Sequence, residues 1–217
     1  MTATAAQPLF MGAMGLAGLL LSPLAELLIS RFLPRLGGLP SPAVRITTAV
    51  VTGALFVLLT LRFGFSPELP AYLLLGMMAV QLSRIDVEHH LLPNPLVLLL
   101  LAAGFCLLTM SAVLAPDWSA LLRAAAGGVI LFLGYLILGL ISPGGLGMGD
   151  VKLSAPLGMY LGYLGWTHLF YGGLLGFVVG GVMTVLMLRL NRGNKPSEVA
   201  HGPAMFAAAI GVALLLA

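Results

Sequence analysis

The chain has 217 residues, of which 60% are hydrophobic and only 8% are charged, and its mean hydropathy is +1.10. A soluble domain usually has about a quarter of its residues charged, so a water-soluble globule and a disordered chain are both excluded. The net charge of +3 comes from 10 basic and 7 acidic residues, which excludes a nucleic-acid binder that works through a basic face. The single Cys106 excludes a disulfide framework and a CxxC zinc site. The composition therefore predicts an integral membrane protein.

Apolar stretches between polar or Pro/Gly-rich breaks are the candidates for membrane-spanning helices, each of which needs about 20 apolar residues. In chain order they are 8–30, 44–63, 69–84, 95–115, 120–142, 151–165, 167–189 and 201–217. The third and sixth are short, and residues 151–189 can be divided differently, so seven helices is the alternative to eight. The loops leave no room for a soluble domain. We predict an all-α fold, a polytopic membrane helical bundle of about eight transmembrane helices, with residues 1–217 as one membrane domain.

The Lys and Arg residues are unevenly distributed between the two sets of alternate loops. Cytoplasmic loops of membrane proteins carry an excess of these residues. The basic residues of the first set are Arg31, Arg35, Arg45, Arg84, Lys152, Arg189, Arg192 and Lys195, whereas the second set has only Arg62 and Arg123. The bias predicts that the first set faces the cytoplasm and that both ends of the chain lie outside.

Acidic residues concentrate in two segments of this apolar chain, 83–94 and 147–152. Ionisable groups near the hydrocarbon core are costly, and they therefore indicate functional sites. The predicted topology places both segments at the cytoplasmic face, although they are far apart in the sequence. We therefore expect Asp86 and Asp150 to lie close together at one boundary of the membrane.

Two neighbouring carboxylates are suited to acid–base chemistry, because they share a proton and their pKa values separate. The ionised member takes a proton from a water that attacks a peptide carbonyl, and the protonated member donates to the oxyanion or to the leaving amine. This chemistry needs no metal and no cofactor, so we expect neither. Gly147 and Gly149 precede Asp150 and allow close approach of a substrate strand, since glycine has no side chain.

The residues of both acidic segments also fit simpler structural roles. Each aspartate alone is most often a solvated residue, Lys152 can anchor a helix at the lipid headgroups, and Asn94 after Pro93 can cap a helix. His89 and His90 beside Glu88 form a weak metal-binding pattern. A small membrane transporter or proton relay through Asp86 and Asp150 is one alternative function, and an inactive scaffold is another. Transporters place ionisable groups at the midplane beside broken helices, whereas these acids lie at one end, which favours a hydrolase.

Two motifs in the sequence resemble those of the type IV prepilin peptidases, which are GxGD-type membrane aspartic proteases. One motif is Gly147-x-Gly149-Asp150-x-Lys152-Leu153, and the other is Asp86 followed seven residues later by Pro93-Asn94. The resemblance covers roughly residues 70–217 and includes His201-Gly202-Pro203-Ala204, which is similar to the start of the family's final helix. It implies that Asp86 and Asp150 are catalytic. The residues that it implies as support for the motifs are Gly147, Gly149, Lys152, Pro93, Asn94 and Glu88.

The resemblance also implies a substrate and a location. The expected activity is removal of the leader peptide from type IV prepilins or pseudopilins, which have a basic leader before an apolar helix. The expected site is the cytoplasmic face of the bacterial inner membrane, with the lipid bilayer as the other partner and no nucleic acid. Long members of the family carry an insertion with two CxxC pairs after the first helix, a region associated with N-methylation. Residues 34–40 occupy that place here without cysteine, so we expect methyltransferase activity to be absent.

Overall fold

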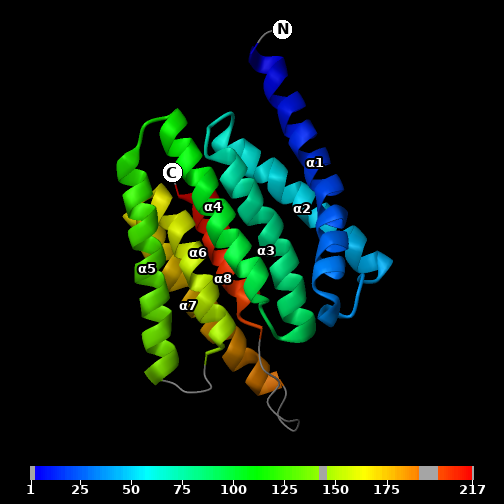
Figure 1. The fold of residues 1–217 in the computed structure, drawn as a ribbon, viewed down its shortest axis with the longest axis vertical. Helices are drawn as coiled ribbons and strands as arrows, with labels where there is room; N and C mark the ends of the chain where they lie inside the picture. Colours follow the sequence, from blue (N-terminus) through cyan, green and yellow to red (C-terminus); the bar gives the residue numbers. More distant parts are fainter. Residues whose placement is uncertain (1–2, 142–145, 191–199, 217) are drawn as a thin grey trace. The chain divides into compact units, whose positions relative to one another are not determined.

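The computed structural model describes residues 3–141, 146–190 and 200–216. In this part of the chain the secondary structure is helical and contains no strand, which confirms the predicted all-α class (Figure 1). The helices are α1 (Ala3–Phe32), the short 3-10 helix η1 (Pro34–Leu36), α2 (Pro42–Phe63), α3 (Leu69–His89), α4 (Asn94–Leu114), α5 (Trp118–Ile141), α6 (Met148–Leu164), α7 (Trp166–Leu190) and α8 (Gly202–Leu215). Each α-helix overlaps one of the eight predicted apolar stretches.

Four of these helices are long and apolar enough to cross a membrane by themselves, so the chain is a multi-pass membrane protein. They cover Gln7–Phe32, Pro42–Phe63, Asn94–Leu114 and Trp118–Ile141. Two shorter apolar helices cover Trp166–Val182 and Gly202–Leu215. A total of eight spans stays a prediction, because α3 carries three charged residues near its end and α6 has only 17 residues.

The chain divides into two compact units, Met1–Gln81 and Leu82–Ala217. The prediction of a single membrane domain is therefore not tested by the fold, and each unit is described separately below. In the first unit, α1 and α2 approach closely at glycines. A Cβ atom on Gly18 would lie 2.9 Å from the Cα of Gly53, so these positions accept only a hydrogen, as is typical of close helix packing in membranes.

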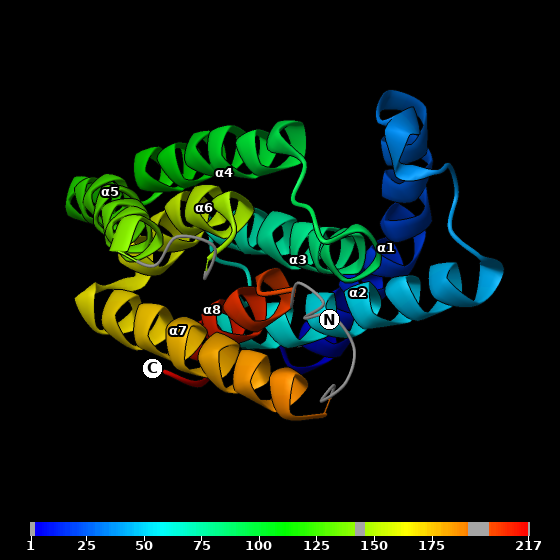
Figure 2. The ribbon, with the colours of Figure 1, turned by 90° about the horizontal axis from the view of Figure 1, so that it is seen from below.

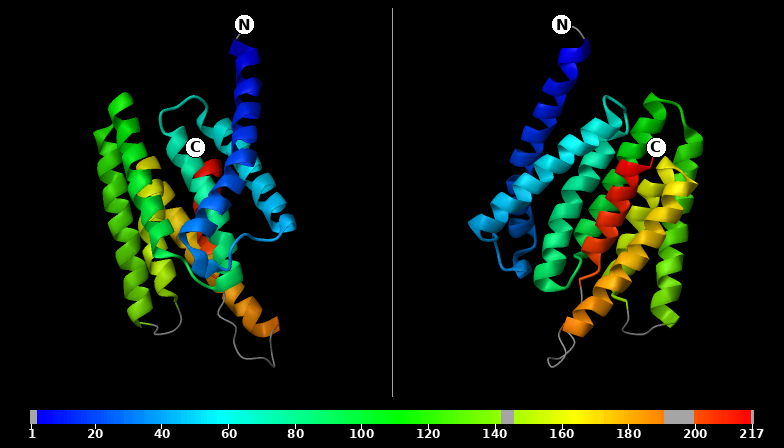
Figure 3. Two further views of the ribbon diagram at one scale, coloured as in Figure 1. Left: turned by 45° about the vertical axis from the view of Figure 1, so that its right-hand side comes forward. Right: turned by 180° about the vertical axis from the view of Figure 1, so that it is seen from behind.

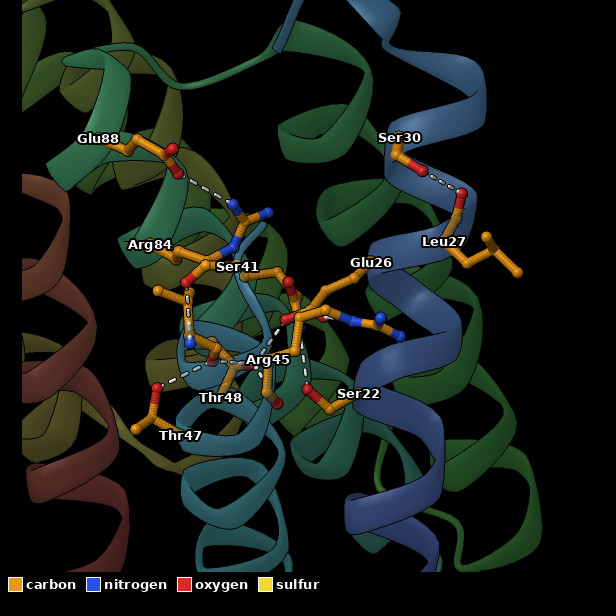
Figure 4. A network of polar contacts seen from close by, with 12 residues as sticks. Ser22, Glu26, Leu27, Ser30, Ser41, Arg45, Thr47, Thr48, Arg84 and Glu88 are labelled. Carbon is orange, nitrogen blue, oxygen red and sulfur yellow. Dashed lines mark hydrogen bonds and ion pairs between the residues drawn. The ribbon is translucent and has the colours of Figure 1, made fainter. Parts of the chain in front are cut away.

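A buried polar network joins the helices of the first unit (Figure 4). The Glu26 side chain is fully buried, accepts a hydrogen bond of 2.5 Å from Thr48 Oγ1, and lies 3.4 Å from Arg45 Nε. One turn away, Ser22 Oγ accepts a hydrogen bond of 3.1 Å from Gln81 Nε2. A buried carboxylate is costly unless it is paired, so this network fixes how α1 faces α2.

In the second unit, α6 is the central helix. It packs against α4, α5, α7 and α8, and all but one of its residues from Leu153 to Tyr163 are buried. Figure 2 shows α6 surrounded by these neighbours, and Figure 3 shows α7 running alongside α8. Because α6 contacts four helices, the buried side chains of its first turn, Asp150 and Val151, are held by the packing of the second unit.

At two of the helix boundaries, the difference from the predicted apolar stretches affects the acidic residues. The apolar stretch 69–84 ends before Asp86, whereas α3 continues to His89. The buried side chains of Leu82 and Ile85 extend the buried face of α3 toward this end. The chain leaves the helix at His90, which has a φ of 50°. The helix predicted to start at residue 151 starts at Met148. The two aspartates therefore lie on helical turns, not in loops.

Candidate active site

Asp86 lies in the last turn of α3 and is 5% exposed. The backbone N–H of Gly202, at the start of α8, donates a hydrogen bond of 2.9 Å to Asp86 Oδ2. This bond joins two segments that are far apart in the sequence. The carboxylate is thus fixed by the end of one helix and the beginning of another.

Asp150 lies in the first turn of α6 and is 7% exposed. Gly147 is the N-cap residue of this helix, and its backbone N–H donates to the Asp150 carboxylate. An acidic side chain that turns back to the N-cap N–H is the acidic half of a capping box. A Cβ atom on Gly147 would lie 3.1 Å from Asp150 Oδ2, so the glycine leaves room for this turn.

The two carboxylates interact electrostatically at the adjoining ends of α3 and α6 in the second unit, beyond the predicted apolar spans 69–84 and 151–165. Burial raises the pKa of Asp150 to about 7, and the negative charge of Asp86 is the second cause. Burial also raises the pKa of Asp86, whereas the Gly202 N–H and the nearby His90 and His201 lower it. A pair coupled in this way loses its two protons in separate steps, so it holds one proton over a range of pH.

Leu92 lies in the turn between α3 and α4. It covers the start of α6, which carries Asp150, and the start of α8, whose Gly202 binds Asp86. Its side chain is 6% exposed. A Cβ atom on Gly149 would lie 3.2 Å from the Cβ of Leu92, and one on Gly202 would lie 3.5 Å from its Cδ2. Leu92 therefore packs directly against both glycines, and a side chain at Gly149 would require Leu92 to shift.

Lys152 and Asn94 connect the starts of α6 and α4. Lys152 Nζ donates a hydrogen bond of 3.0 Å to Asn94 Oδ1. The N-cap of α4 is Pro93, whose carbonyl accepts from the N–H groups of Leu96 and Val97. The Asn94 side chain therefore binds Lys152 and does not cap its helix. This contact links the start of α6 to the turn that carries Leu92.

Glu88 lies apart from the carboxylate pair. Its side chain is 52% exposed and is 3.2 Å from Arg84 Nη1, one turn earlier on α3 (Figure 4). His89 Nε2 lies 3.9 Å from the same carboxylate. Such an exposed pair contributes little to stability. Across the described ranges, no three His, Cys, Asp or Glu side chains gather as a metal site would require.

Leu92 is a site residue that the sequence patterns do not single out, and the contact of Gly202 with Asp86 is one that they do not predict. The Gly-Pro at 202–203 marks a helix start, but the contact of Gly202 with Asp86 depends on how α8 packs against α3. Leu92 is one leucine in an apolar sequence. Their positions in the sequence are the one indication that both belong to the site, since Leu92 directly precedes Pro93 and Gly202 directly precedes Pro203.

The fold and the site define a multi-pass helical membrane protein with two buried, interacting carboxylates at adjoining helix ends. A sequence profile described as the Type IV leader peptidase family matches residues 72–185, a range that includes both aspartates. The chain therefore belongs to the type IV leader peptidase family. No solved structure gives a significant match to it.

Curated relatives agree with this family. The chain is 37% identical over 143 residues to a prepilin leader peptidase/N-methyltransferase of Stutzerimonas stutzeri, covering 65% of this chain and 48% of the relative. It is 34% identical over 163 residues to one of Pseudomonas aeruginosa, covering 75% and 53%. It is 31% identical over 164 residues to one of Bacillus subtilis, covering 74% and 62%. The chain thus matches about half to three fifths of the length of these relatives.

Proposed function

We propose that this chain is an aspartic endopeptidase that removes the leader peptide from type IV prepilins or pseudopilins. The observation that carries the proposal is the pair of buried carboxylates, Asp86 and Asp150, whose charges interact at the ends of α3 and α6. The names of the relatives supply the substrate class, since they are called prepilin leader peptidases. Membership of the leader peptidase family supports the same activity.

The proposed reaction uses both carboxyl groups of the pair. The ionised carboxylate takes a proton from a water molecule while the water oxygen adds to the peptide carbonyl carbon, and the protonated carboxyl gives its proton to the carbonyl oxygen. The resulting gem-diol collapses as the first carboxyl protonates the amide nitrogen and the C–N bond breaks. A hydroxyl proton of the diol returns to the second carboxylate. One water is consumed, and the pair regains its single proton.

The substrate would be a prepilin with a basic leader followed by an apolar helix, bound at the cytoplasmic face of the bacterial inner membrane. Co-expression with a candidate prepilin tests the activity most simply. We expect a mobility shift that corresponds to loss of the leader, and the shift should be absent when the variant Asp150→Asn replaces the wild type. An unshifted prepilin beside the wild-type chain, with a known relative cleaving it in parallel, would count against the proposal.

The orientation of the chain is a separate prediction, based on the uneven Lys and Arg loops. In a Cys106→Ala background, we expect Ser41→Cys to resist a membrane-impermeant thiol reagent in intact cells and Ser119→Cys to react. Ser41 is the N-cap of α2, and Ser119 donates a hydrogen bond to Asp117 at the start of α5. The Lys and Arg bias assigns the loops of these two residues to opposite sides of the membrane. Labelling of Ser41→Cys from outside would reverse the orientation and place the carboxylates away from the cytoplasm.

The proposed chemistry needs no metal ion, which predicts resistance to chelation. EDTA should leave prepilin cleavage unchanged, and the double variant His89→Ala/His90→Ala should reduce it only modestly. Glu88 pairs with Arg84 and lies 3.9 Å from His89 Nε2. His90 follows the end of α3 and interacts electrostatically with Asp86. Activity that is lost on chelation and restored by an added metal would indicate metal-assisted hydrolysis instead.

Methyl transfer is a second activity in the printed names of the relatives. The expectation that it is absent from this chain rests only on the short, cysteine-free segment 34–40, and the relatives give it no support. The test uses mature pilin made by this chain with S-adenosylmethionine present. The mass of its N-terminal peptide shows whether the new N-terminus is methylated. An added methyl group on that peptide would refute the expectation.

A further inference from the structure

The beginning of α8 is in direct contact with one carboxylate of the pair. Helix α8 has 14 residues, and the first N–H groups of a helix have no partner within it. The N–H groups of Ala204 and Met205 turn back to the carbonyl of His201, and residue 203 is a proline without an N–H. The N–H of Gly202 is the one that reaches across to Asp86 Oδ2, at 2.9 Å.

Gly202 is required here for space and not for backbone conformation. Its φ lies outside the left-handed region that favours glycine. A Cβ atom at this position would lie 2.8 Å from Asp86 Oδ2 and 3.4 Å from its Cγ. Any side chain would therefore push the carboxylate away from the N–H that binds it. Leu92 closes the other side of Gly202, at 3.5 Å from the same Cβ position.

The surroundings of the two carboxylates differ in charge. Asp86 faces the N-terminus of α8 and the imidazoles of His90 and His201, and the N–H that it accepts from Gly202 at this helix N-terminus favours a carboxylate over a carboxylic acid. Asp150 faces the N–H of Gly147, the charge of Asp86 and the hydroxyl of Tyr135 on α5. Once Asp86 is ionised, its charge favours the protonated form of Asp150.

We propose that Gly202 is a positioning residue that holds Asp86 as the ionised member of the pair, so that Asp86 acts as the general base and Asp150 as the general acid. This inference rests on the proposed peptidase function, and it divides the two roles that the reaction requires. The role of Gly202 is to place a backbone donor against Asp86 with no side chain between them. The direction of the pKa shift at Asp150 agrees with this division.

Carboxyl titration tests the division of roles without reference to activity. The chain contains three aspartates, Asp86, Asp117 and Asp150, so labelling their carboxyl carbons with 13C gives three resonances in the full chain in detergent micelles. In the variant Asp150→Asn, we expect Asp86 to titrate at a lower pH than Asp150 does in the variant Asp86→Asn. The reverse order would overturn the proposal.

The variant Gly202→Ala tests the positioning role. The added methyl displaces Asp86 from the N–H, which removes a bond to the charged form and raises the pKa of Asp86. Both the 13C midpoint of Asp86 and the acidic limb of the pH–rate profile should move up by about one pH unit. The control is Gly211→Ala on the same helix, where a Cβ atom meets nothing within 4 Å, and it should shift neither.

The outcomes separate this inference from the proposed function. A lower rate for Gly202→Ala with an unmoved acidic limb would reduce Gly202 to a packing role and overturn the proposal. If Gly202→Ala does not fold, the titration order in the two Asn variants still decides the question. A wild-type chain that cleaves no prepilin would refute the proposed function, whereas the same titration would continue to test how the proton is divided.

Discussion

Replacing either aspartate of the pair with asparagine should abolish prepilin cleavage and leave the fold intact. Asn has nearly the shape of Asp but cannot hold or release the shared proton, so Asp86→Asn and Asp150→Asn should each lower the rate by about a hundredfold to ten-thousandfold. Because the two groups act as one unit, the double variant should be little worse than either single variant. The rate of leader release by purified protein in micelles measures this.

The third aspartate of the chain provides the matched control. Asp117 lies before α5 and accepts hydrogen bonds from Ser119 Oγ at 2.6 Å and from the N–H of Ala120 at 2.9 Å. Asn at this position can accept similar bonds, so Asp117→Asn should cleave at the wild-type rate. Substantial cleavage by Asp86→Asn or Asp150→Asn would remove that residue from the proposed catalytic role.

Substitution of Gly158 by Ala should destabilise the second unit, because α5 and α6 meet there backbone to backbone. A Cβ atom on Gly158 would clash with the carbonyl oxygen of Gly127, and one on Gly127 would lie 2.5 Å from the carbonyl oxygen of Gly158. Backbone atoms of two packed helices cannot move aside cheaply, and overpacking of this kind typically costs about 1–3 kcal/mol. We expect a lower thermal midpoint in detergent, with loss of cleavage.

Another glycine of α5, about two turns further along the helix, serves as the comparison for this substitution. A Cβ atom on Gly134 meets nothing within 4 Å, so Gly134→Ala should keep the wild-type thermal midpoint and activity. The same midpoint for Gly158→Ala and the wild type would show that α6 is not held by this contact. In that case the packing of α5 would not explain how Asp150 is fixed.

The helical class can be predicted from the sequence because a bilayer imposes long apolar runs, and each of the eight predicted stretches overlaps a helix. For a physical reason, α3 continues past the apolar stretch 69–84 and α6 begins before the stretch 151–165. Hydropathy marks where lipid contact ends, whereas a helix continues as long as its backbone is bonded and one face is buried. Ile85, fully buried beyond the predicted end of its stretch, shows the difference.

The candidate site is predictable to the extent that it is carried by local motifs. Asp86 and Asp150 stand out because carboxylates are rare in such a chain, although their catalytic role stays a proposal. The contact between Gly202 and Asp86 is not predictable, since it depends on how distant helices pack. Glu88 is grouped with the motif by its nearness in sequence. Its position on α3 directs it toward Arg84 instead.

The mass of a prepilin after incubation with the purified protein shows whether this chain alone cleaves a prepilin through its two carboxylates. Wild-type chain in detergent micelles is compared with the double variant Asp86→Asn/Asp150→Asn, purified in the same way. We expect a single cut that releases the basic leader with the wild-type chain and intact prepilin with the double variant. Cleavage at equal rates by both proteins would contradict the claim.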